Sequence, residues 1–275
     1  MATHWQAGRF CLQLDRPLIM GIVNVTPDSF SDGGQHGSPS QALAHAQGLL
    51  EAGADILDIG GESTRPGSPR LTPAQEWERI APVIAEAVRW NVPISVDTYQ
   101  PETMRRALDC GADILNDIHA LSRPGALELA AASQAGVCLM HMQGEPGTMQ
   151  QAPQYDDVSR EVRQFLLDRA AALRALGVAP ARIALDPGFG FGKTLDHNLV
   201  LARTLGTLCA QGYPVLVGVS RKSMIGALTG RGIADRLAGS LAAALACVAA
   251  GAHVLRVHDV AATVDAIKVW RAMHA

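Results

Sequence analysis

Residues 18–34 read Leu-Ile-Met-Gly-Ile-Val-Asn-Val-Thr-Pro-Asp-Ser-Phe-Ser-Asp-Gly-Gly. The apolar run over 18–25 has the length and composition of a buried strand, whereas Pro27 and the Gly33–Gly34 pair are typical of a loop. Asn24 lies at the junction, where its amide either satisfies the backbone of the loop or belongs to a site at the strand end. The same change from apolar strand to polar loop recurs along the chain, and this recurrence favours a site.

Short apolar runs rich in Val, Ile and Leu alternate with segments of helical pattern. The eight runs are Leu18–Val25, Ile56–Ile59, Pro93–Val96, Asp113–Leu115, Val137–His141, Ile183–Leu185, Val215–Val219 and Val254–Val257. The helical patterns cover roughly 40–52, 74–90, 101–109, 126–134, 157–176, 195–208, 235–250 and 260–273. Strands that are apolar on both faces and alternate with helices are expected to be parallel. Eight units at a mean spacing of about 34 residues predict an α/β fold, the closed (β/α)8 TIM barrel.

Local signals support these boundaries. Thr72 and Pro73 predict the N-cap and first residue of a helix, and Gln75 completes a capping box. Three similar phrases each indicate a helix that ends at a glycine just before a strand. They are Ala-Gly-Ala-Asp at 52–55, Cys-Gly-Ala-Asp at 110–113 and Ala-Gly-Ala-His at 250–253. Weak alternation over 9–15 predicts a short strand or hairpin.

Composition excludes several classes of protein. The net charge of −3 gives no basic surface for nucleic acid or an anionic membrane. The five cysteines include no Cys-x-x-Cys pair, and the N-terminus lacks the pattern of a signal peptide, so we expect a cytoplasmic protein. The 275 residues show no break in composition. We therefore expect one domain over 1–275, in which residues 1–17 cap the barrel.

Polar side chains lie at the end of every predicted strand. They are Asn24, Asp58, Asp97, Asn116, Asp117, His141, Asp186, Ser220, Arg221, Lys222, Arg256, His258 and Asp259. A single Asp at such a position often caps a helix or forms a salt bridge. So many polar groups at the carboxyl ends of barrel strands instead predict an active site.

Two kinds of binding group can be separated among these residues and the loop after the second strand. One kind suits the edge of a flat, polar heterocycle. It comprises Asp97, Asn116, Asp186 and Lys222. The other kind looks outward and suits an anion such as diphosphate. It comprises Asn24, Arg65, Arg256 and His258. The alternative for Arg256 and His258 is a structural ion pair with Asp259.

The glycine-rich segment 186–194 ends in Gly-Lys-Thr, as a phosphate-binding P-loop does. Pro187 stands where that motif requires glycine, and the dinucleotide fingerprint is also absent, so we exclude an ATPase and a nicotinamide enzyme. The turn instead presents Phe189 and Phe191, whose rings could contact a planar ligand.

Two further chemistries are open at these positions. Lys222 could form a Schiff base if it is buried, but its polar neighbours favour a hydrogen-bonding role. The histidines lack the spacing of metal ligands. A Mg²⁺ ion remains compatible with Asn24 and a bound diphosphate.

Several of these segments together resemble dihydropteroate synthase, in order and over about residues 18–265. They are Asn-Val-Thr-Pro-Asp-Ser-Phe-Ser-Asp-Gly-Gly at 24–34, Asp-Ile-Gly-Gly-Glu-Ser-Thr-Arg-Pro-Gly at 58–67, Ser-Val-Asp-Thr at 95–98, Asn-Asp-Ile at 116–118, Leu-Met-His-Met-Gln-Gly at 139–144, Asp-Pro-Gly-Phe-Gly-Phe-Gly-Lys at 186–193, Ser-Arg-Lys-Ser at 220–223 and Arg-Val-His-Asp at 256–259. That family is a group of transferases in folate biosynthesis and the target of sulfonamides. It condenses 6-hydroxymethyl-7,8-dihydropterin diphosphate with 4-aminobenzoate to form 7,8-dihydropteroate and diphosphate.

The resemblance implies a role for each matching position. The pterin would bind to Asp97, Asn116, Asp186 and Lys222, with Met140 against its ring. The diphosphate would face Thr64, Arg65, Arg256 and His258, and Asn24 would reach a Mg²⁺ cofactor. The aminobenzoate would be bordered by Thr64, Pro66, Phe191 and Ser220. The chain would act as a homodimer formed through outer helices near its C-terminal half.

The expected mechanism is SN1-like, with Mg²⁺-assisted departure of diphosphate before the arylamine attacks. The catalytic residues would be Asp97, Lys222, Arg256 and His258, with Asp97 ionised beneath the pterin cation. Two alternatives remain: a pterin-dependent methyltransferase that serves a corrinoid protein, and a catalytically inactive binding homologue. The residues suited to a diphosphate, Arg65, Arg256 and His258, argue against the methyltransferase, which would have no use for them. No role is assigned to Tyr99, Gln100 or His119.

Overall fold

The computed structural model describes residues 2–26, 39–63 and 70–274. Its main sheet has eight parallel strands in the order β8-β7-β6-β5-β4-β3-β10-β9. They are β3 (Leu18–Asn24), β4 (Ile56–Gly60), β5 (Ile94–Asp97), β6 (Ile114–Asp117), β7 (Gly136–Met140), β8 (Ile183–Asp186), β9 (Leu216–Val217) and β10 (Val254–Val257). A parallel bridge between Leu185 and Val215 joins the two ends of the sheet. The predicted TIM barrel is confirmed.

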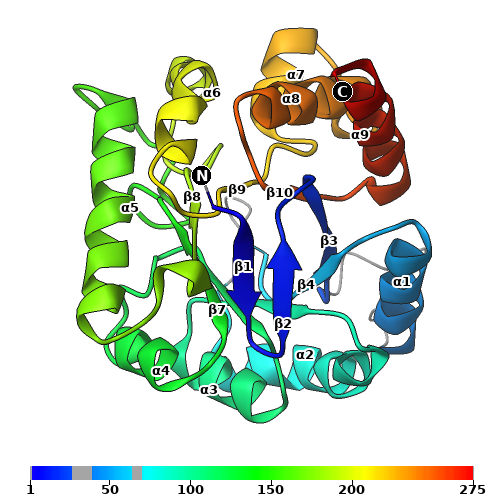
Figure 1. The fold of residues 1–275 in the computed structure, drawn as a ribbon, viewed down its shortest axis with the longest axis vertical. Helices are drawn as coiled ribbons and strands as arrows, with labels where there is room; N and C mark the ends of the chain where they lie inside the picture. Colours follow the sequence, from blue (N-terminus) through cyan, green and yellow to red (C-terminus); the bar gives the residue numbers. More distant parts are fainter. Residues whose placement is uncertain (1, 27–38, 64–69, 275) are drawn as a thin grey trace.

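Helices surround the strands, and a hairpin lies across one end of the barrel (Figure 1). The hairpin pairs β1 (His4–Ala7) with β2 (Phe10–Gln13). The helices are α1 (Pro39–Glu51), α2 (Pro73–Ala87), α3 (Pro101–Asp109), α4 (Ala126–Ala132), α5 (Val158–Ala175), α6 (Leu195–Cys209), α7 (Ser223–Thr229), α8 (Leu237–Ala249) and α9 (Val260–His274), with 3-10 turns at Val88–Trp90, Pro180–Arg182 and Ile233–Asp235. No helix of the described residues combines the length and apolar character that a membrane crossing requires.

The local signals in the sequence correspond to observed caps. Helix α2 begins with the predicted capping box, in which the Gln75 amide donates to Thr72 Oγ1 at 3.3 Å and the Thr72 amide donates to Gln75 Oε1 at 3.0 Å. The glycines of the three repeated phrases, at 53, 111 and 251, all have φ near +100° (98, 102 and 99°). Each ends its helix in the left-handed region, and a strand follows at once.

The structure differs from the sequence prediction around β9. The predicted strand over 215–219 is reduced to Leu216–Val217, and helix α7, which we had not predicted, follows it. Gly226 in the middle of α7 leaves room for the Arg236 guanidinium, since a Cβ there would lie 2.2 Å from Arg236 Nη2. A seven-residue helix with a central glycine has little local signal, so its stability depends on tertiary contacts.

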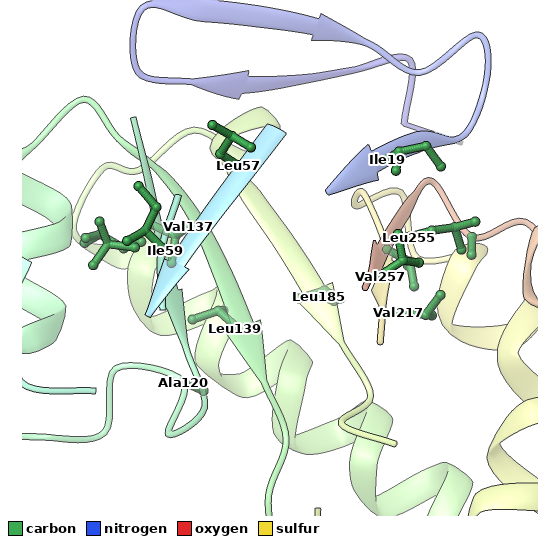
Figure 2. Close-up of a cluster of buried hydrophobic side chains, with 14 of the residues drawn as sticks. Ile19, Leu57, Ile59, Ala120, Val137, Leu139, Leu185, Val217, Leu255 and Val257 are labelled. Atoms are coloured by element: carbon green, nitrogen blue, oxygen red, sulfur yellow. The ribbon is translucent and has the colours of Figure 1, made fainter. Parts of the chain in front are cut away.

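The two larger apolar clusters of the described residues lie on opposite sides of the barrel wall. Between strands and helices lies a large cluster that includes Leu57, Val137 and Leu185 (Figure 2). Inside the barrel, a smaller cluster packs beneath the hairpin residues Trp5 and Ala7. It comprises Leu18, Met20, Ile56, Ile114, Cys138, Ala184, Leu216 and Val254. The hairpin therefore closes the amino ends of the strands and leaves the carboxyl ends for a site.

Candidate active site

Asp58 lies at the centre of a buried polar network inside the barrel. Its side chain is fully buried and accepts hydrogen bonds from Ser95 Oγ at 2.5 Å and from Asn116 Nδ2 at 3.2 and 3.3 Å. Arg256 Nε donates to its second oxygen at 2.6 Å. These residues come from β4, β5, β6 and β10, so one carboxylate connects half of the barrel wall.

Arg256 joins Asp58 to Asp97, since its Nη2 donates to Asp97 Oδ2 at 2.6 Å. Burial alone would lower the pKa of Arg256, but the two carboxylates raise it above its ordinary value, so the guanidinium stays charged. The alternative pairing of Arg256 with Asp259 is wrong, because Asp259 binds Arg221, with Nε and Oδ2 2.9 Å apart. The outward orientation that we expected for Arg256 is also wrong in the described structure.

Asp97 is a partly buried carboxyl at the end of β5. Burial raises the pKa of Asp97 to about 7, although Arg256 acts to lower it. In the register of the sheet, Asp97 lies beside Asn116 on β6 and beside Gly60 on β4, whose other neighbour is Asn24. Four predicted or adjacent site positions therefore stand at one level of the barrel.

Asp186 and Lys222 supply further charge at the mouth, because Lys222 follows β9, the strand that the Leu185–Val215 bridge joins to β8. Asp186 ends β8, and its Oδ1 accepts the Gly188 amide at 2.7 Å. Burial raises the pKa of Asp186, and Lys222 opposes the shift. Burial lowers the pKa of Lys222 to about 8, with Asp186 opposing. Lys222 Nζ also donates to the Phe189 carbonyl, which fits the predicted hydrogen-bonding role.

The two phenylalanines of the glycine-rich turn differ in exposure. Phe189 is fully buried in the core, whereas Phe191 is half-buried and packs near Met140, Tyr99 and Ile118. The Lys222 ammonium lies 4.4 Å from the centre of the Phe191 ring. Phe191 is thus the aromatic side chain that this turn leaves accessible beside Met140.

Ser220 and His258 meet at the end of β10. The backbone amide of His258 donates to Ser220 Oγ at 3.2 Å, and the same hydroxyl lies 3.0 Å from His258 Nδ1. Ser220 is buried, whereas His258 is half-buried. The hydroxyl therefore fixes the orientation of the imidazole at the barrel mouth.

Comparison with known proteins agrees with this geometry. A family model described as pterin binding enzyme matches residues 20–258. A curated dihydropteroate synthase from Neisseria meningitidis serogroup C is 59% identical over 279 residues, which cover 99% of each chain. The chain belongs to the dihydropteroate synthase family.

Solved structures of dihydropteroate synthases share the fold along the whole chain. The enzyme from Xanthomonas albilineans, solved with 4-aminobenzoic acid, has a TM-score of 0.94 at 50% identity and covers 100% of this chain and 99% of its own. The enzyme from Burkholderia cenocepacia, complexed with 7,8-dihydropteroate, has a TM-score of 0.91 at 48% identity. The match covers 99% of this chain and 97% of that enzyme's chain.

The dihydropteroate synthase residues predicted from sequence are distributed as follows. The described barrel mouth holds Asn24, Asp97, Asn116, Met140, Asp186, Phe191, Ser220, Lys222, Arg256 and His258. Thr64, Arg65 and Pro66 lie outside the described residues. Among the described residues, no group of three His, Cys, Asp or Glu side chains could hold a metal ion.

Two other strand-end residues of this dihydropteroate synthase family member do not face the mouth. Asp117 is buried and accepts the amides of His119 at 2.7 Å and Leu121 at 2.8 Å, so it fixes the turn after β6. His141 is buried against Lys193 Nζ, at 3.0 Å from its Nδ1. Asp117 therefore has a structural role, in a turn rather than in the helix cap or salt bridge that we gave as the alternative.

Sequence reasoning missed structural roles for Ser95 and Tyr99. Ser95 donates to Asp58 two residues before Asp97 on the same strand, a spacing that places both on one face. Tyr99, to which no role was assigned, donates to Glu62 Oε1 at 2.7 Å and meets the His119 ring edge-on at 5.0 Å. The period-two spacing could have identified Ser95, whereas the Tyr99 contact joins separate loops and has no local signal.

Proposed function

We propose that the chain is a dihydropteroate synthase, a transferase that condenses 6-hydroxymethyl-7,8-dihydropterin diphosphate with 4-aminobenzoate. The observation that carries this proposal is the pair of charged sets at one barrel mouth. One set connects Asp58, Arg256 and Asp97 through hydrogen bonds. The other comprises Asp186 and Lys222, which both bond to the turn after β8. Binding and cation stabilisation require both sets.

The pterin binds between these sets. Carboxylates of Asp97 and Asp186 accept N–H groups of the heterocycle, and Asn116 and Lys222 complete its hydrogen bonds. Such charge-assisted bonds contribute about 1.5–3 kcal/mol each. Met140, beside Asp186 in the register, packs against the ring.

Departure of diphosphate generates negative charge. Arg256 and His258 stabilise this charge, together with Thr64 and Arg65, which lie outside the described residues. A guanidinium has five N–H donors, and the carboxylates of Asp58 and Asp97 take two of them in Arg256. The other three have no hydrogen-bond partner among the described residues and are available to an anion. Each 1.36 kcal/mol of stabilisation that is specific to the transition state accelerates departure about tenfold.

Bond breaking precedes bond making in this mechanism. The positive charge left on the pterin methylene spreads into the ring, where the ionised carboxylate of Asp97 stabilises it. The arylamine then attacks, and its excess proton passes to solvent. Phe191 and Ser220, with Thr64 and Pro66, border the aminobenzoate.

The site fits a Mg²⁺ ion held mainly by substrate. Asn24 ends β3 half-buried and offers an amide oxygen, the kind of hard ligand that Mg²⁺ prefers. Mg²⁺ commonly takes its other ligands from substrate phosphates and water. When bound, the ion would neutralise charge on the diphosphate.

The assembly and location follow the same proposal. Residues 1–275 act as one pterin-binding domain in the cytoplasm, with 1–17 as the cap that Trp5 anchors in the barrel. A homodimer forms through α7 and α8, where exposed apolar side chains support an interface.

The deciding experiment measures diphosphate release from dihydropterin diphosphate and Mg²⁺, with and without 4-aminobenzoate, followed by mass analysis of the product. We expect release coupled to dihydropteroate formation. Pterin binding without release or condensation would contradict the proposal and favour the methyltransferase or inactive-homologue alternative.

A further inference from the structure

The turn after β8 lies flat on the chain that leaves β7. Gly188 has φ +68°, and a Cβ there would lie 1.9 Å from the His141 carbonyl oxygen. Gly192 has φ +60°, and its Cβ would lie 2.2 Å from the Gln143 carbonyl oxygen. Only glycine satisfies both the left-handed backbone and the close approach. The glycine spacing that resembles a P-loop therefore serves contact between two segments of backbone.

This contact places several acceptors around Lys193, whose side chain is almost fully buried. Its Nζ lies 3.2, 3.0 and 2.9 Å from the carbonyl oxygens of His141, Gly188 and Phe191, and 3.0 Å from His141 Nδ1. An ammonium group has three donors and no acceptor, so this surrounding suits it. Lys193 thereby ties both ends of the Gly188–Phe191 turn to the end of β7.

The protonation states are consistent with that geometry. Burial, with a smaller effect of Lys193, lowers the pKa of His141 to about 3, so the ring is neutral and its Nδ1 can accept. Burial lowers the pKa of Lys193 to about 7, and Asp186 opposes the shift. Lys193 remains a donor in either state, since a neutral amine keeps two N–H groups.

The turn that Lys193 holds carries groups of the proposed active site. Asp186, two residues before the turn, accepts the Gly188 amide at 2.7 Å, and Lys222 Nζ donates to the Phe189 carbonyl. The Phe191 amide donates to the Gly188 carbonyl at 3.1 Å. Two of the carbonyls that surround Lys193 thus flank the segment that presents the Phe191 ring.

We propose that Lys193 is a positioning residue that fixes Phe191 for the arylamine substrate. The assignment of that substrate rests on the proposed function. Lys193 itself is buried behind the turn, and within the described residues its Nζ contacts backbone carbonyls and the His141 ring rather than a proposed reacting group. Its loss leaves three carbonyl oxygens converging without a cation, and the turn relaxes to hydrate them.

The test compares the Lys193→Met variant with wild type in two measurements. Steady-state kinetics should show KM for 4-aminobenzoate raised about tenfold, as the loss of a charge-assisted hydrogen bond predicts, with KM for the pterin diphosphate changed much less. Amide hydrogen exchange in substrate-free protein should be faster for the peptide 186–194 and unchanged elsewhere.

Matched variants keep the outcome decisive. Lys193→Gln retains two N–H donors and should be intermediate in both measurements, and it replaces Lys193→Met if that variant fails to fold. The exposed Lys268→Met should match wild type. Unchanged exchange and unchanged KM for 4-aminobenzoate in a folded Lys193→Met protein would overturn the proposal. If wild type lacks synthase activity, the proposed function fails, and exchange still decides whether Lys193 fixes the turn.

Discussion

The guanidinium of Arg256 holds two carboxylates together, and this dependence can be measured. Arg256→Met leaves Asp58 buried without its cationic partner, so we expect the free energy of unfolding to fall by about 3–5 kcal/mol. Urea denaturation measures the change. The matched double variant Arg256→Met with Asp58→Asn should recover much of the stability but not the activity. Equal destabilisation in the single and double variants would show that the ion pair does not hold the network.

Asp97 leads to a pH prediction. Burial raises the pKa of Asp97 to about 7, and the proposed cation stabilisation requires the ionised form. The dependence of kcat/KM on pH reports groups of the free enzyme. Activity should therefore fall as the pH decreases through about 7, because Asp97 gains a proton.

The Asp97→Asn variant tests the same assignment. It should lose about two to three orders of magnitude in kcat, the usual effect of removing one electrostatic stabiliser, and also lose the acidic limb of the pH profile. Measurement of kcat and kcat/KM between acidic and mildly alkaline pH provides both values. Full turnover by Asp97→Asn would disprove the cation role.

Sequence predicted which strand ends are polar, but not which of them face the mouth. Asn116 and Asp117 are adjacent, as are Met140 and His141, yet only the first of each pair lies at the level of Asp97 or Asp186. Successive strand residues point to opposite faces, so the phase of the strand decides. The alternation of side chains along each strand could be derived from the sequence. The inward orientation of Arg256 could not, because it depends on Asp58, which lies far away in the sequence.

At the scale of elements, the strands and most helices were predictable because their signals are local. Capping residues, C-terminal glycines and apolar runs each act within a few residues. Helix α7 and the two-residue β9 were not predictable for the opposite reason. Gly226 of α7 accommodates Arg236, and Arg236 Nη1 donates to the Arg221 carbonyl at 3.0 Å. Those contacts form only in the folded protein.

The hairpin is an element whose contribution is to stability. Trp5 is fully buried in the apolar end of the barrel, and its Nε1 donates to the Arg182 carbonyl at 3.1 Å. Trp5→Ala should lower the free energy of unfolding by about 3–5 kcal/mol, because the substitution leaves a cavity. Trp5→Phe, the control, should cost less because it keeps most of the volume. Thermal and urea unfolding measure both variants, and kcat and KM of the folded fraction should stay at wild-type values. Altered KM would mean that the hairpin influences the mouth.

In the whole molecule, the barrel interior is divided between two tasks. The amino ends of the strands contain apolar side chains beneath the hairpin, and the carboxyl ends contain the charged sets. Ion pairs of this kind cost desolvation free energy, so the apolar half and the surrounding helices must supply the net stability. This division explains why the predicted strands are apolar along their length and polar only where they end.

The outside of the molecule leads to the last prediction. Leu228 on α7 is 56% exposed, Ile233 in the turn after it is 51% exposed, and Leu237 at the start of α8 is 39% exposed. Burial of such side chains against a second copy would remove apolar surface from water, which favours association. Leu237→Glu would place a charge in the proposed interface, and if wild type is the proposed dimer, the variant should be a monomer in sedimentation velocity. Leu176→Glu, at a position after α5 that is 48% exposed, should leave the proposed dimer intact. A monomeric wild type, or a dimeric Leu237→Glu variant, would exclude this face as the interface.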